Sequence, residues 1–216
     1  MTSKAGARTK VDVLSFGAEV VAVSASGVLA PGPLFFANVL YGTRRGAISG
    51  IKVAHGHALV EIAVIVAIAA GLFSAPAFVE TYSAPIAVLG GVAVIGFAGL
   101  QVYSVLRKDR REQKEKGKSP FAVGIALTAL NPFFLVWWLT VGIKLVADSS
   151  AFGPVAGTGL LFGMHVWMDY AWLAATAYLA SKGSSVLGSK YYKILMLGLA
   201  GVLAYYGAQF LASGLG

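Results

Sequence analysis

The chain is 216 residues long, and 57% of its residues are hydrophobic while only 12% are charged. A soluble domain carries about twice that fraction of charge, and the mean hydropathy of +0.76 points away from a soluble fold as well. The apolar residues form runs of roughly twenty or more positions, which predicts an all-α polytopic membrane protein.

Cysteine content and charge exclude several classes of function. The chain has no cysteine, which rules out disulfide frameworks, thiolate metal sites and thiol catalysis. The net charge is +8, but the basic residues lie between apolar runs, where they suit contact with anionic lipid. We therefore expect the lipid bilayer, and not nucleic acid, to be the macromolecular partner.

Hydropathy predicts six membrane spans, of which residues 13–41 are the first. The later spans are expected at residues 47–73, 82–106, 121–147, 153–180 and 191–212. The first apolar run follows a basic N-terminal tail, as in a signal peptide, but it continues through Pro33 to about residue 40. We therefore expect this segment to remain as a membrane helix.

A basic segment at residues 107–119 separates two halves, residues 1–106 and 120–216, each with three predicted spans. The loops after spans one, three and five contain 13 of the 17 Lys and Arg residues, counting Lys52 and Lys193 near their ends. Basic loops stay on the cytoplasmic side of a membrane. The central loop is therefore expected in the cytoplasm, with both termini outside the cytoplasmic membrane.

Two pairs of motifs relate the halves to each other. The stretch "APGPLFF" at residues 30–36 corresponds to "LNPFFLVWW" at 130–138, and "HALVE" at 57–61 corresponds to "HVWMD" at 165–169. Because each half has an odd number of spans, the second half enters the membrane from the opposite side. Matched motifs in the same order predict two inverted three-helix repeats, an organisation that many secondary transporters share.

Prolines interrupt the first and fourth predicted spans near mid-membrane. Proline removes a backbone donor and clashes with the preceding turn, and the freed backbone groups must be satisfied by protein or by a water-filled cavity. We therefore expect helices one and four to be broken, with their partially charged ends facing inward. Such ends suit the charged groups of a zwitterion. The predicted substrate-binding residues are Pro31, Gly32, Pro33, Asn131 and Pro132.

Ionisable residues occur inside the predicted spans. His57 and Glu61 are four residues apart in the second span, and His165 and Asp169 have the same spacing in the fifth. Residues at this spacing share one helix face, and carboxylates inside a membrane are rare and face the protein interior. Histidine changes charge near neutral pH, so the pairs predict a proton-coupling site. Glu19, in the outer part of the first span, is a further candidate for this role.

The same side chains leave a second interpretation open. Two histidines and two carboxylates are also ligands for a divalent cation, although their spacing does not require a closed tetrahedral site. We expect no resident metal and no cofactor. We also expect no enzymatic activity, because the sequence contains no phosphate loop, nucleophile elbow or zinc-protease motif.

Aromatic and small residues predict contacts around this site. Tyr205 and Tyr206 are typical of the membrane interface. Trp137 and Trp138 follow the second proline break and are interpreted as packing residues, with cavity lining as the alternative. The stretches "GPVAG" and "GLLFG" have small residues four positions apart, which favours close helix contact within the monomer or across a homodimer.

Several of these stretches resemble one family of membrane transporters. "SGVLAPGPLFFANVLYGTRRGAISGIKVAHGHALVE" is similar to the first third of LysE/RhtB-type amino-acid exporters, with their PGP motif and basic turn. "VLGGVAVIGFAGLQVYSVLR" resembles the third helix of that family, and "ALTALNPFFLVWW" resembles its fourth-helix NP motif. Phe133 stands where the family pattern often has lysine. The resemblance implies a dimeric inner-membrane exporter of amino acids or related metabolites that is driven by protons.

Overall fold

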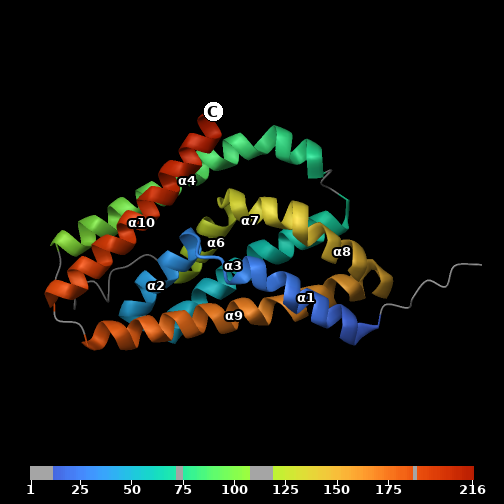
Figure 1. The fold of residues 1–216 in the computed structure, drawn as a ribbon, viewed down its shortest axis with the longest axis horizontal. Coiled ribbons are helices and arrows are strands. Elements are labelled where there is room, and N and C mark those ends of the chain that lie inside the picture. The colour runs from blue at the N-terminus through green and yellow to red at the C-terminus, as the bar shows by residue number, and fades with distance from the viewer. Residues whose placement is uncertain (1–11, 72–74, 108–118, 187–188) are drawn as a thin grey trace, which may run out of the picture.

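The computed structural model describes residues 12–71, 75–107, 119–186 and 189–216, and within these ranges the chain is helical apart from short turns. Figure 1 shows the helices arranged as an elongated bundle, with the last helix lying beside α4 along one edge. The predicted basic segment falls largely on residues 108–118, which lie outside the described ranges, as do residues 1–11.

The first predicted span consists of two helices, α1 (Val13–Val28) and α2 (Pro33–Arg45), which meet at a bend of 77°. The next two spans are continuous and correspond to α3 (Ala47–Ala69) and α4 (Ala75–Arg107). The predicted break in helix one is therefore confirmed, and it occurs at the PGP motif.

The fourth predicted span is broken as well. It begins as α6 (Pro120–Ala129), which ends just before Asn131. The segments that continue it are α7 (Pro132–Trp137), the π-helix η1 (Trp138–Gly142), α8 (Ile143–Ser149) and the short 3-10 helix η2 (Ser150–Phe152). The last two spans are α9 (Pro154–Val186) and α10 (Ser189–Leu215).

Length and composition support a membrane location. The helical stretches Ala47–Ala69, Pro132–Phe152 and Lys193–Leu215 are each long and apolar enough to cross a membrane, and the bent pair α1–α2 passes as a fourth. Shorter apolar helices in the described ranges are Ala84–Leu100 and Pro120–Ala129. Together with the lack of strands in the described part of the chain, these helices confirm the prediction of an all-α polytopic membrane protein.

Helices from the two halves of the chain pack against each other. α3 lies between α9 and α6, both α1 and α2 pack on α9, and α4 pairs with α10. Glycines permit these contacts: Gly50 faces the backbone of α9, Gly56 lies against Gly124 on α6, and Gly91 lies against Gly207 on α10. A side chain at any of these positions would hold the helices apart, and small residues have this role in membrane helix packing.

Two large apolar clusters hold the helices together. One cluster joins α2, α4, α6 and α10, and its largest fully buried side chains include Leu40, Leu203 and Phe210. The other joins α1, α3, η1, α8 and α9 around Phe16 and Trp138. The polar groups that the sequence placed inside the spans lie outside these two clusters.

Candidate functional site

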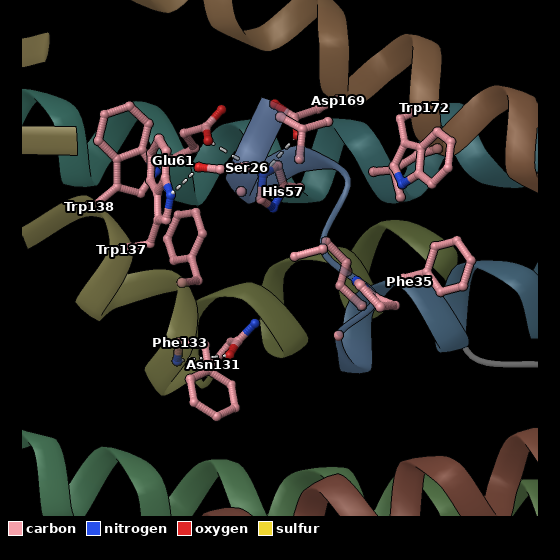
Figure 2. A pocket seen from close by; sticks show the side chains of 18 of the residues that line it. Ser26, Phe35, His57, Glu61, Asn131, Phe133, Trp137, Trp138, Asp169 and Trp172 are labelled. Carbon is pink, nitrogen blue, oxygen red and sulfur yellow. Dashed lines mark hydrogen bonds and ion pairs between the residues drawn. The ribbon is translucent and has the colours of Figure 1, made fainter. Parts of the chain in front are cut away.

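The two helix breaks open on one cavity of about 470 Å³. Figure 2 shows it with Trp137 and Trp138 at one end, Phe35 and Trp172 at the other, and the ionisable residues between them. The lining residues are Ser26, Gly27, Val28, Ala30, Pro31, Gly32, Leu34, Phe35, His57, Glu61, Asn131, Phe133, Phe134, Trp137, Trp138, His165, Asp169, Trp172, Leu173 and Tyr206. Most of these side chains are apolar or aromatic.

The first break contributes Pro31 and Gly32 to the lining, while Pro33 is buried as the first residue of α2. Proline is well suited to this position, since its missing N–H would have no partner in a first turn. Gly32 is the N-cap residue of α2 and lines the cavity, so the partially positive end of this helix lies at the cavity wall. The carbonyl of Pro31 accepts a hydrogen bond of 2.7 Å from the Tyr206 hydroxyl.

The second break has a different cap. The side-chain oxygen of Asn131 accepts the backbone N–H of Phe133 at 3.1 Å and thereby caps α7, whose first residue is Pro132. Asn131 also lines the cavity, whereas Pro132 is not among the lining residues. Phe133 lies beside Phe210 of α10, with ring centroids 5.3 Å apart. The aromatic ring therefore fills the position at which the family pattern often has a lysine.

Two helices bring the four predicted intramembrane ionisable residues into one cluster. His57 and Glu61 come from α3, and His165 and Asp169 come from α9. The Nε2 atom of His165 lies 2.9 Å from Oε1 of Glu61 and 3.3 Å from Oδ2 of Asp169. The Nε2 atom of His57 lies 3.4 Å from Oε1 of Glu61 and 3.6 Å from Oδ1 of Asp169. We call these four residues the central cluster.

The central cluster is almost completely buried, with Glu61 only 1% exposed and Asp169 5% exposed. The carboxylate oxygen of Glu61 that does not face the histidines, Oε2, has no hydrogen-bond partner among the described residues. Charges in a low-dielectric interior are stable only when paired and hydrogen-bonded. Each ionised member of the cluster therefore depends on the neighbouring members of the cluster for compensation of its charge.

In both histidines a hydroxyl group contacts Nδ1, the ring nitrogen that does not face the carboxylates. Nδ1 of His57 lies 2.9 Å from the Thr128 hydroxyl on α6, and Nδ1 of His165 lies 2.7 Å from the Ser24 hydroxyl on α1. Both hydroxyls are fully buried. Sequence reasoning did not single out Ser24 or Thr128, because small polar residues are common in membrane helices and only the fold brings these two against the histidines.

The central cluster is also the part of the described chain that could hold a metal ion. One ligand atom each from His57, Glu61 and Asp169 lie within 4.8 Å of one another. Mixed imidazole and carboxylate donors suit a first-row divalent cation. These side chains are therefore suitable ligands for a transported divalent cation, and they can also bind a proton.

Glu19 lies apart from the central cluster and does not line the cavity. Its carboxylate and that of Asp148 both contact the ammonium group of Lys144 on α8, the latter at 2.6 Å. This ion pair connects α1 to the segment that follows the second break. The structure therefore brings together four of the five predicted proton-coupling residues.

Two aromatic residues have contacts that the sequence did not predict. Tyr206, which was assigned to the membrane interface, lines the cavity and binds the carbonyl of the first break. The Trp137 indole N–H donates to the Ser26 hydroxyl at 3.2 Å across the same cavity. Each contact joins residues more than 100 positions apart in the chain, so no local pattern could have revealed it.

Comparison with known proteins places this chain in a family. The family model described as LysE type translocator matches residues 25–214. This range includes both helix breaks and the whole central cluster. No curated protein and no solved structure matched the chain.

Proposed function

Because the chain belongs to the LysE type translocator family, we propose that it exports amino acids or related small metabolites across the cytoplasmic membrane in exchange for protons. One observation carries the proposal: both helix breaks and the central cluster face a single cavity. Helix ends beside a binding site recognise the charged groups of a zwitterion, and broken helices of this kind form the substrate sites of many transporters.

The lining of the cavity supports a neutral or cationic substrate. It contains two carboxylates and two histidines, and no lysine or arginine is found among the described lining residues. Aromatic side chains form both ends, with Phe35 stacked on Trp172 at a centroid distance of 6.0 Å. Apolar walls of this kind suit an amino acid whose side chain is uncharged, and the aromatic faces also attract an ammonium group.

We propose that transport proceeds by alternating access between two inverted repeats, residues 1–106 and 120–216. The packing supports this proposal, because the second helix of each half contacts the first helix of the other half, as α3 contacts α6 and α9 contacts α1 and α2. The central cluster lies at the contact between α3 and α9. Relative motion of the two halves therefore changes the distances within the cluster, and this links proton binding to access.

A transport assay in liposomes tests the proposal. Purified protein is reconstituted with a pH gradient, and uptake of labelled neutral and basic amino acids is measured. We expect Glu61→Gln and Asp169→Asn each to abolish gradient-driven transport, because each removes an ionisable carboxylate from the cluster. Asp148→Asn is the matched control, since Asp148 lies outside the cavity. Undiminished gradient-driven transport by both cluster variants would refute the coupling.

The alternative cargo is a divalent cation, which the grouping of His57, Glu61 and Asp169 favours. The two candidates separate in a thermal-stability screen of the purified protein. Stabilisation by amino acids in the presence of a chelator supports the first function. Stabilisation by divalent metal alone that disappears in a His57→Ala and His165→Ala double variant supports the second.

A further inference from the structure

The two histidines of the central cluster have different hydrogen-bond surroundings, although their sequence motifs match. Each ring has one nitrogen facing the carboxylates and the other facing a hydroxyl. Each hydroxyl comes from the half-helix that precedes a break, and it contacts the histidine that belongs to the other half of the chain. The hydrogen bonds of these hydroxyls determine which ring nitrogen carries the hydrogen.

Thr128 leaves His57 only one arrangement. Its hydroxyl donates to the carbonyl of Gly124 at 2.7 Å, so its single hydrogen is already used. Toward Nδ1 of His57, at 2.9 Å, the hydroxyl oxygen can then only accept. Nδ1 of His57 therefore carries a hydrogen, and in the neutral ring the lone pair of Nε2 faces the carboxylates. The longer Nε2 distances of 3.4 and 3.6 Å agree with this orientation.

His165 has the opposite arrangement. Its Nε2 lies 2.9 Å from Oε1 of Glu61, a distance typical of a hydrogen bond, and an ionised carboxylate can only accept. Nε2 of His165 therefore carries a hydrogen. The Ser24 hydroxyl has no other hydrogen-bond partner in the described part of the chain, so its hydrogen is free to point at Nδ1, 2.7 Å away.

We propose that Thr128 and Ser24 are positioning residues that hold the two histidines in opposite tautomers, Nδ1–H in His57 and Nε2–H in His165. The cluster then presents one nitrogen lone pair, on His57, and one N–H group, on His165, to the same two carboxylates. On the proposed function, this asymmetry leaves Nε2 of His57 as an acceptor beside the carboxylates, while the N–H group of His165 keeps Glu61 oriented.

Nitrogen-15 NMR of the full chain in lipid tests the assignment directly. The chain has three histidines, and His57→Gln and His165→Gln variants assign the signals. His55 is a reference, because its Nδ1 contacts the carbonyl of Ile51 at 2.8 Å and must carry a hydrogen there. Across a titration to pH 11, we expect Nδ1 of His57 to stay protonated while its Nε2 titrates, and the reverse for His165.

Variants of Thr128 and Ser24 show whether these residues position the histidine rings or only fill space between the helices. Thr128→Val removes the accepting oxygen and is expected to lower the Nδ1–H to Nε2–H ratio of His57 about fivefold, which corresponds to one ordinary hydrogen bond. Thr128→Ser restores the ratio. Ser24→Ala changes the His165 signals alone, and unchanged signals of the other histidine in each variant show that the fold is intact.

Three results would overturn the proposal. They are the same tautomer in both rings, a Thr128→Val ratio equal to that of the unaltered chain, and rings that stay doubly protonated up to pH 11. None of these measurements depends on transport. Failure of the tautomer assignment is therefore distinguishable from failure of the proposed export function, which the liposome assay tests.

Discussion

Replacement of Gly50 by alanine tests whether the contact between α3 and α9 sets the geometry of the central cluster. A Cβ atom at Gly50 would overlap the carbonyl oxygen of Leu173 and would lie 2.7 Å from its carbonyl carbon, where ordinary contact begins at 3.4 Å. The helices must therefore separate by at least about 0.7 Å, and overpacking of this kind costs about 1–3 kcal/mol.

The separation has a consequence for the cluster. If α3 and α9 move apart as rigid bodies, the 2.9 Å contact between His165 and Glu61 lengthens to about 3.6 Å or more, which is beyond the roughly 3.2 Å limit of a hydrogen bond. We expect Gly50→Ala to lower both the thermal unfolding midpoint in detergent and the gradient-driven transport rate in liposomes.

Gly163→Ala is the matched control for this prediction. Gly163 lies on α9 two residues before His165, and a Cβ atom there meets no described atom within 4 Å. Alanine favours helix over glycine by up to about 1 kcal/mol, so this variant should be as stable as the unaltered chain or more so. The reasoning fails if Gly50→Ala retains full stability and transport, or if Gly163→Ala loses as much as Gly50→Ala does.

Two further experiments probe contacts made by the broken spans. Tyr206→Phe removes the donor to the Pro31 carbonyl at the first break, and thermal unfolding should show a loss of about 0.5–1.5 kcal/mol, because one hydrogen bond is lost; an unchanged midpoint would mean that water replaces the hydroxyl. A double-mutant cycle of Glu19→Gln and Lys144→Met should give a coupling of only about 0.2–1 kcal/mol that falls with added salt, because these side chains are 36% and 63% exposed. A larger, salt-independent coupling would show that the pair is shielded from solvent.

Much of the fold could be predicted from residue order because each span is a local feature. The apolar runs and the prolines act within about twenty residues, and α1 ends before Pro31 while α7 begins at Pro132 for the same local reason. Asp12 is also a local feature: its carboxylate accepts the backbone N–H of Ser15 at 2.8 Å and caps α1, which lowers the pKa of Asp12. The π-helix after Trp137 has no such signal in the sequence.

The candidate site, too, could be predicted from the sequence only in part. The spacing of His57 and Glu61, and of His165 and Asp169, predicted two pairs on two helix faces, since four residues make about one helical turn. The sequence could not show that all four side chains meet, because that depends on Gly50 allowing α3 to approach α9. Nor could it show that the two helix breaks face these residues across one cavity.

By itself, the sequence determined the membrane class, the helical segments, the positions of both breaks and the residue types available for chemistry. These properties follow from hydrophobicity, helix period and proline geometry, which act over short distances along the chain. The tertiary structure decided which polar groups share a cavity and which hydroxyl binds each histidine. It also placed Glu19 with Lys144 outside the cavity. These outcomes depend on contacts between helices more than 60 residues apart, which only packing against a common core can fix.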